Sequence, residues 1–226
     1  MKCSMFHLLI LTSAILLAGC GLAGTQGVNL SKASTADLGG DLSKASTADL
    51  VRLLENEKGG DNFLEIISEF TRRGSSASEA APALARALAY NRRDSIIACR
   101  PLVAMGWAAH SAIPVLFENL SNERADVRLG SAFVLGTIGS ASKCAVPKLG
   151  SLLWDSDSGV RSAAAAALQS ITGAELVDPG YELDPTIPGS VFLDEPVGKV
   201  SANARSWWSA TGKNTNWLVD DCKPRE

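Results

Sequence analysis

The sequence is poor in the residues that most often carry catalysis and metal binding. It has two histidines, His7 and His110, and it contains no CxxC pair and no P-loop. His7 lies in an N-terminal segment that we expect to be removed, which leaves one histidine and argues against a histidine triad or a multi-histidine metal site. We therefore expect no enzyme activity, no metal and no cofactor.

Excess positive charge is also missing. The 226 residues carry a formal net charge of −3, so no surface for nucleic acid or other polyanions is expected. Aromatic residues make up 6% of the chain and apolar residues 46%, which is typical of a globular protein and not of a disordered one.

No apolar run is long enough to cross a bilayer, but a short one lies near the N-terminus. About ten mostly apolar residues run from Leu8 to Leu17 after Lys2, whereas a membrane span needs about 20. This is the pattern of a secretory signal. The run ends in Leu17-Ala18-Gly19-Cys20, which resembles the lipobox of bacterial lipoproteins.

The lipobox resemblance implies that residues 1–19 are a signal peptide and that Cys20 is the lipidation site. Lipid on the Cys20 sulfur and acylation of the new amine, for example with palmitate, would anchor the chain, because several acyl chains give stable attachment. Gly21 in place of Asp favours the outer membrane, with the protein facing the periplasm. An ordinary cleaved signal with a chance cysteine is the alternative.

Residues 20–46 are predicted to form the lipidated cysteine and a flexible tether. The nine residues LSKASTADL at 30–38 recur unchanged at 42–50. The first copy runs into Gly39-Gly40, which disfavours a helix. The second runs into an apolar helical pattern, with Ser46 or Thr47 as its N-cap.

Residues 47–173 repeat one pattern at a nearly constant interval. Each of the last three units has a proline at the start of its first helix, at Pro82, Pro114 and Pro147. A polar break and a second helix follow, and a glycine ends each unit, at Gly74, Gly106, Gly139 and Gly173. The pattern predicts four stacked helical hairpins, the first of them weakly marked.

The last two units carry the most specific signature. Ala-Val/Ile-Pro-x-Leu is followed by an acidic break and then by Val127-Arg128 or Val160-Arg161, which resembles HEAT repeats, closest to the short bacterial form seen in phycobilin-lyase-type proteins. The resemblance implies an all-α solenoid of about four HEAT-like hairpins. The second unit departs from the pattern: Ile96 stands at the arginine position, and Pro101 inside the second helix predicts a bend or a late helix start.

The HEAT resemblance also implies that the second helices line a concave binding surface. Their arginines are therefore candidate partner-binding residues, namely Arg72, Arg73, Arg100, Arg128 and Arg161. The alternative, which we favour for Arg128 and Arg161, is that these side chains pair with acids of neighbouring repeats.

The C-terminal region differs from the repeats. Residues 174–198 are rich in proline and acids and are expected to be a linker or a strap along the solenoid. Residues 199–226 are expected to hold a short helix over Val200–Ala210 that caps the last repeat. Trp207, Trp208 and Trp217 belong to this cap or form an aromatic site for a partner.

Three cysteines remain after cleavage and lipidation: Cys99, Cys144 and Cys222. One disulfide is possible in an oxidising envelope, but we expect Cys99 and Cys144 to be small core residues on helices.

The leading functional hypothesis is a lipid-anchored HEAT-repeat scaffold or adaptor in the bacterial cell envelope. Its partners would be unidentified envelope proteins and, through the anchor, the membrane, with no nucleic acid. A bilin-lyase-like enzyme or chaperone, by resemblance alone, and a purely structural spacer are the alternatives.

Overall fold

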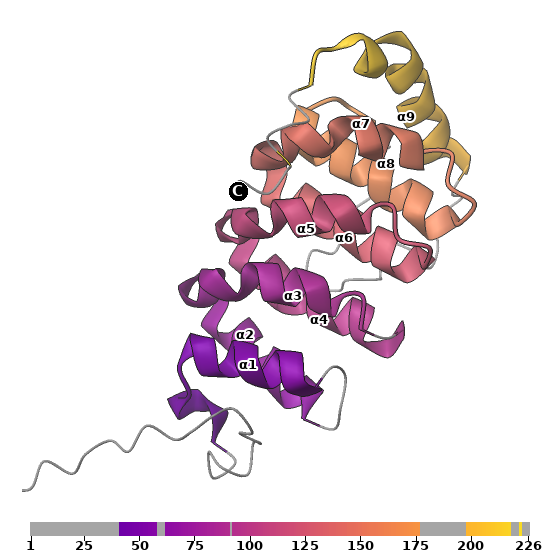
Figure 1. Ribbon diagram of the computed structural model, residues 1–226. Coiled ribbons are helices and arrows are strands. Elements are labelled where there is room, and N and C mark those ends of the chain that lie inside the picture. The colour runs from indigo at the N-terminus through magenta and orange to yellow at the C-terminus, as the bar shows by residue number, and fades with distance from the viewer. Residues whose placement is uncertain (1–40, 58–61, 91, 177–197, 218–221, 223–226) are drawn as a thin grey trace, which may run out of the picture. The chain divides into compact units, whose positions relative to one another are not determined.

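The computed structural model describes residues 41–57, 62–90, 92–176, 198–217 and 222, and every regular element in these ranges is a helix (Figure 1). The predicted signal peptide, Cys20, the first copy of LSKASTADL and most of the predicted linker lie outside the described residues.

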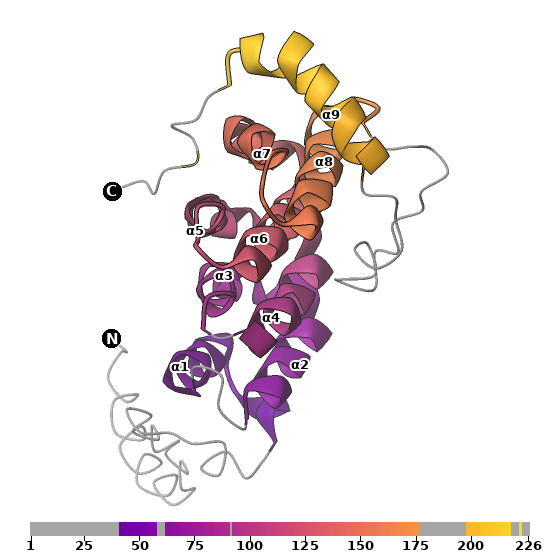
Figure 2. The ribbon, with the colours of Figure 1, turned by 90° about the vertical axis from the view of Figure 1, so that its right-hand side faces the viewer.

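Four helical hairpins follow one another along the chain. They pair α1 (Thr47–Glu57) with α2 (Phe63–Arg73), α3 (Ala81–Ala87) with α4 (Arg92–Met105), α5 (Ile113–Asn119) with α6 (Ala125–Ile138), and α7 (Val146–Leu152) with α8 (Ser158–Thr172). Figure 2 shows the first helices in one row and the second helices α2, α4, α6 and α8 in another. The predicted all-α solenoid is therefore confirmed.

Glycine and proline determine where the helices of each hairpin begin and end. Each of the first three hairpins is joined to the next by a 3-10 turn, and these turns are η4 (Gly74–Ala80), η5 (Gly106–Ala112) and η6 (Gly139–Ala145). Their first residues, and Gly173 after α8, have φ between 52° and 76°, a region that glycine enters at no steric cost. The prolines of the pattern stand at the first positions of α3, α5 and α7, where a missing N–H costs nothing.

The core lies between the two rows of helices. The leucines that follow each proline are at most 1% exposed; they are Leu84, Leu88, Leu116, Leu120, Leu149 and Leu153. Small residues let α6 and α8 approach closely, because a Cβ added to Gly136 would lie 2.9 Å from the Cα of Ala167. Stacking thus buries apolar faces that a single hairpin would leave in water.

The second helix of the second unit starts earlier than expected. Helix α4 begins at Arg92, the repeat position at which α6 begins at Ala125 and α8 at Ser158. The predicted late start is therefore wrong. Pro101 is buried inside α4, and we attribute the continuous helix to its packing against α2 and α6 on either side.

The described end of the predicted tether is attached to the first hairpin. A short 3-10 helix, η3 (Leu42–Lys44), precedes α1, and Leu42 and Ala45 are each only 7% exposed. The Ser46 hydroxyl caps α1 by accepting the Asp49 N–H at 3.1 Å. Residues 41–46, expected to be flexible, instead belong to the folded part, because apolar side chains of this segment are buried there.

A last helix, α9 (Gly198–Ala210), and the turn η8 (Gly212–Asn214) follow the repeats. Helix α9 packs against α8 (Figure 1). It begins two residues before the predicted Val200 and ends at the predicted Ala210.

Two helical stretches have the length and hydropathy of a membrane span. They are Ile96–Asn119 and Ala125–Leu152, and 50% and 56% of their most apolar windows are buried within the fold. Each contains one of the glycine turns described above, at Gly106 or Gly139. Core helices of soluble proteins pass the same test, so these stretches are weak evidence for membrane insertion.

Candidate protein-binding surface

The exposed sides of α2, α4, α6 and α8 form a continuous surface, which we call the second-helix face (Figure 2). One apolar residue stands ten residues before the unit-ending glycine on three successive helices: Leu64, Ile96 and Leu129. Their spacing along the chain is the same as that of the unit-ending glycines. In this register Ile96 is equivalent to Leu129 and Ser95 to Arg128, so the prediction that Ile96 stands at the arginine position is wrong. Leu64 is 54% exposed and Ile96 47%, and Leu129 is half-buried. We call these three residues the apolar ladder.

An open pocket of about 220 Å³ continues the ladder along the same face. Its lining comes from α4, α6 and α8 and consists of Val103, Phe133, Gly136, Thr137, Ala163, Ala166, Ala167 and Ser170. Val103 is seven residues after Ile96, and Phe133 is four after Leu129, so these side chains share the helix sides that carry the ladder. The bottom of the pocket lies close to the helix backbones because the residues there are mostly glycine and alanine.

Two exposed arginines border the ladder. Arg100 lies one turn after Ile96 and is exposed, and it forms no ion pair with any residue in the described ranges. The Arg72 side chain is 64% exposed, although it donates to Glu69. Of the five predicted arginines, these two are exposed, whereas Arg73, Arg128 and Arg161 are half-buried.

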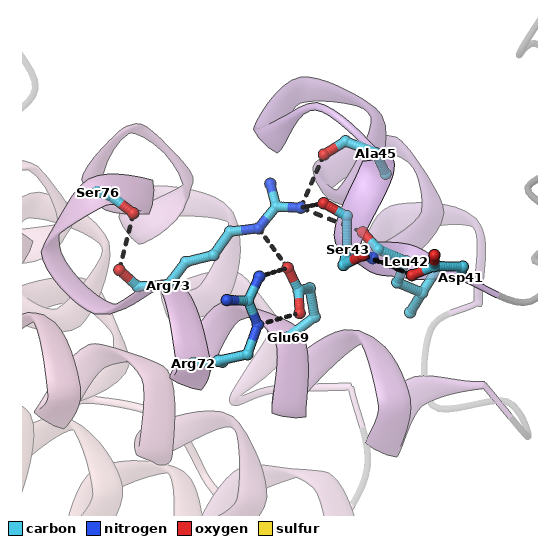
Figure 3. A network of polar contacts seen from close by, with 8 residues as sticks. All are labelled: Asp41, Leu42, Ser43, Ala45, Glu69, Arg72, Arg73 and Ser76. Atoms are coloured by element: carbon cyan, nitrogen blue, oxygen red, sulfur yellow. Dashed lines mark hydrogen bonds and ion pairs between the residues drawn. The ribbon is translucent and has the colours of Figure 1, made fainter.

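Arg73 points toward the chain that precedes α1 (Figure 3). Its Nε donates to Glu69 at 2.6 Å, and its Nη2 donates to the backbone carbonyls of Leu42, Ser43 and Ala45 at 3.1, 3.3 and 2.7 Å. The Arg73 side chain is only 13% exposed. Its role is to hold residues 41–46 on α2, and no sequence pattern indicated this.

Glu69 lies between the two arginines (Figure 3). Hydrogen bonds from Arg72, aided by Arg73, lower the pKa of Glu69 from 4.5 to about 2, although burial acts in the opposite direction. The carboxylate is thus held in its charged form by its neighbours.

Arg128 joins the third hairpin to the fourth. Its Nε and Nη2 donate to the two carboxylate oxygens of Asp155 at 2.8 and 2.7 Å, and the two side chains are 13% and 7% exposed. Burial alone would raise the pKa of Asp155, but the hydrogen bonds from Arg128 and from the Asp157 amide hold it below its usual value. The predicted pairing of Arg128 with an acid of a neighbouring repeat is confirmed.

Arg161 has a different partner from the one expected. Its Nη1 donates to the backbone carbonyls of Asp155 and Ser156 at 2.9 and 3.1 Å. Arg128 makes the same two contacts one repeat earlier, to Asn122 and Glu123. Arg161 therefore closes its own turn, and within the described ranges it makes no bond to an acidic side chain of a neighbouring repeat, because α8 is the last second helix of the stack.

The C-terminal tryptophans lie in the contact between the tail and the last hairpin. A Cβ added to Gly150 of α7 would overlap the Trp208 indole, and Gly212 lies against both Trp207 and Trp208. The Trp217 Nε1 donates to the Gly212 carbonyl at 2.8 Å. All three rings are half-buried, which favours the cap over an open aromatic site.

A disulfide fixes this tail. Cys144 in η6 bonds to Cys222, with the two Cα atoms 5.5 Å apart. The prediction that Cys144 is a core thiol is wrong, and the alternative of a single pair is correct. Cys99 is a buried thiol on α4, and burial raises its pKa to about 12, so it is unreactive as a nucleophile at neutral pH.

Of the two histidines, His7 lies outside the described residues, and His110 does not lie on the second-helix face. His110 is in η5, where it stacks on Trp107 with ring centroids 6.1 Å apart and an angle of 9° between the ring planes. Within the described ranges no group of three or more His, Cys, Asp or Glu side chains could hold a metal ion.

Sequence reasoning missed the apolar ladder. The signal was present, since Leu64, Ile96 and Leu129 recur at the repeat spacing, but apolar residues on a helix are normally assigned to the core. Only the exposure of these side chains distinguishes them from core leucines.

A family profile described as HEAT repeats matches residues 113–179. No curated protein and no solved structure matches the chain. The matched segment contains α5, α6, α7 and α8, which hold the Val-Arg pattern and the Arg128–Asp155 pair. The third and fourth hairpins of this solenoid are therefore HEAT-like repeats.

Proposed function

We propose that this protein is a lipid-anchored scaffold of the bacterial cell envelope that binds a protein partner on the second-helix face. The apolar ladder carries the proposal. It places apolar side chains in water at the same position of three adjacent helices, on a side that the core does not use. Contiguous apolar surface bordered by polar groups is typical of interaction sites.

Binding, and not catalysis, is the proposed activity, and no cofactor is required for it. HEAT-like repeats commonly mediate protein–protein interaction. The contact would be made by the ladder, the adjacent pocket, Arg72 and Arg100, whereas Arg73, Arg128 and Arg161 support the fold.

Two observations support the proposed location. The Leu17-Ala18-Gly19-Cys20 sequence fits lipidation at Cys20, and the Cys144–Cys222 disulfide is a bond that persists in oxidising compartments such as the periplasm. Gly21 favours the outer membrane, facing the periplasm.

The anchor is tested by Cys20→Ala. We expect wild-type protein to incorporate labelled palmitate and to sediment with outer membranes, and the variant to do neither. Labelling and membrane association that persist in Cys20→Ala would show that the anchor is elsewhere or absent.

The scaffold role is tested by affinity capture after crosslinking in cells. We expect one enriched envelope protein with the wild type, lost when Leu64 and Ile96 are both changed to Asp. Trp107→Asp is the matched control, since Trp107 is 74% exposed but lies in η5, off the second-helix face. Absence of any enriched partner would favour the spacer.

A further inference from the structure

We infer that the partner segment on the second-helix face is an acidic amphipathic helix that lies across α2, α4 and α6, with a carboxylate bound to Arg100. The inference rests on the proposed function and specifies the chemistry of its partner.

The spacing of the apolar ladder favours a helical partner segment over an extended one. Packed neighbouring helices lie about 8–10 Å apart, so Leu64, Ile96 and Leu129 present apolar side chains at about that interval. Residues i and i+7 of a helix share one side and are about 10.5 Å apart. An extended strand presents side chains on one side about 6.6 or 13 Å apart, which fits the ladder poorly.

The charge beside Ile96, the middle residue of the ladder, favours an acid in the partner. Arg100 is exposed one turn from Ile96, without an ion pair in the described part of the chain. Arg72 is a second exposed cation, paired with Glu69. Acids lie at the two ends of the ladder, Glu65 next to Leu64 and Asp126 and Asp157 in a pocket with Leu129, so the carboxylate of the partner is placed at the middle, opposite Arg100. A carboxylate one turn from an apolar residue of the partner would meet the Arg100 guanidinium, whose planar fork binds both carboxylate oxygens.

The pocket beside Arg100 gives the partner a place for one apolar side chain. Val103 and Phe133 form its apolar wall, and Ala163, Ala166 and Ala167 contribute its low floor. Apolar anchors in a pocket next to an arginine are the usual centre of binding energy in an interface.

A second copy of this chain fits the face less well. A two-fold axis through α4 would bring the Arg100 side chains of both copies together, and like charges in contact oppose association. The acidic segment at 177–197 of this chain has a similar composition and is treated as a competing occupant.

Photocrosslinking in the cells that make the full-length protein tests the inference. Ile96 is replaced by p-benzoyl-phenylalanine, and the crosslinked peptide is sequenced by mass spectrometry. We expect a peptide of another protein with apolar residues at i and i+7 and with an acid one turn from one of them. Arg100→Glu should lower the yield of this adduct about tenfold or more, and Arg100→Lys should retain most of it.

Arg52→Glu is the matched control, because Arg52 is 61% exposed but lies on the first helix α1, and it should leave the yield unchanged. Circular dichroism and urea midpoints verify that all variants fold.

An adduct with residues 177–197, with a second copy or with lipid would overturn the inference, as would an adduct unaffected by Arg100→Glu. A peptide of another protein that lacks acids would refute the acidic helix but leave the scaffold role intact. Absence of any protein adduct at Ile96 would refute both.

Discussion

Among single residues, the ion pairs of this chain differ in how much water reaches them. The Arg128–Asp155 side chains are 13% and 7% exposed, whereas those of Arg86 and Glu55 are 50% and 45% exposed. Removing one partner of a buried pair leaves an uncompensated charge, but exposed charges are solvated whether paired or not.

We therefore predict that Arg128→Ala lowers the free energy of unfolding by about 3 kcal/mol. Arg86→Ala, the matched control, should lower it by less than about 0.5 kcal/mol. Urea unfolding at neutral pH measures both. Similar losses for the two variants would mean that the Arg128–Asp155 pair does not hold the third and fourth hairpins together.

The lowered pKa of Glu69 predicts how the stability of the fold changes at acidic pH. Its pKa is about 2 in the fold against an ordinary value of 4.5, so its charge stabilises the fold above pH 4.5, and this contribution is lost as the pH falls from 4.5 toward 2. The shift corresponds to at most about 3 kcal/mol. Glu69→Gln should be less stable than wild type at pH 7 and should lose less stability on acidification.

Unfolding midpoints measured between pH 7 and pH 2 test this. Glu65→Gln on the same helix is the control, because Glu65 is exposed and should leave the acid sensitivity unchanged. Identical pH profiles for wild type and Glu69→Gln would refute the assignment.

Sequence patterns predicted some residue contacts and not others. The Val-Arg pattern, through its resemblance to HEAT repeats, implied that Arg128 pairs with an acid of a neighbouring repeat. The bonds of Arg73 were not predictable, since their acceptors are backbone carbonyls 28 to 31 residues earlier and any residue type offers a carbonyl.

At the level of elements, α9 and α7 pack through a glycine. The Trp208 indole occupies the space that a Cβ on Gly150 would need. Alanine is a better helix former than glycine by about 1 kcal/mol, so an uncovered Gly150 would gain stability on substitution.

We predict the reverse for Gly150→Ala in the wild type, a loss of about 1–2 kcal/mol because the rigid indole must move. In a Trp208→Ala background the same change should instead stabilise by about 1 kcal/mol. The test is a double-mutant cycle: thermal unfolding is measured for the wild type, Gly150→Ala, Trp208→Ala and the double variant, with tryptophan emission as a second signal. The same sign in both backgrounds would contradict the packing of α9 on α7.

Local patterns located most helix boundaries, since glycine and proline act through backbone geometry alone. They failed where tertiary packing determines which residues belong to an element. Pro101 was expected to bend α4 or to delay its start, and the second alternative is wrong, since the helix starts in register between α2 and α6. Residues 41–46 were assigned to a flexible tether, yet Leu42 and Ala45 are buried.

For the molecule as a whole, the disulfide closes the longest covalent loop in the described residues, with a sequence separation of 78 between Cys144 and Cys222. A crosslink of this span restricts the unfolded chain and contributes up to about 4 kcal/mol.

We predict that reduction with dithiothreitol and the substitution Cys222→Ser each lower the melting temperature, and that the two shifts are equal. Dithiothreitol should have no further effect on Cys222→Ser, which separates the disulfide from other effects of the reductant. An unchanged melting temperature in both cases would refute a stabilising role for this bond.

The repeat period was enough to predict the solenoid, because stacking follows from apolar faces that recur in register. It could not predict the binding surface. Ile96 and Leu84 are both apolar residues on helices, and only the packed structure shows that one is 47% exposed and the other 0%.

The disulfide also makes the two ends of the solenoid unequal in stability. A linear array held by nearest-neighbour contacts frays from its ends, but here the last hairpin and α9 lie within one covalent ring that closes at Cys144 in η6. The first hairpin has no such closure among the described residues, and Arg73 holds the chain before it through hydrogen bonds alone. Partial opening, and with it cleavage by proteases, should therefore begin at the first hairpin and not at the last.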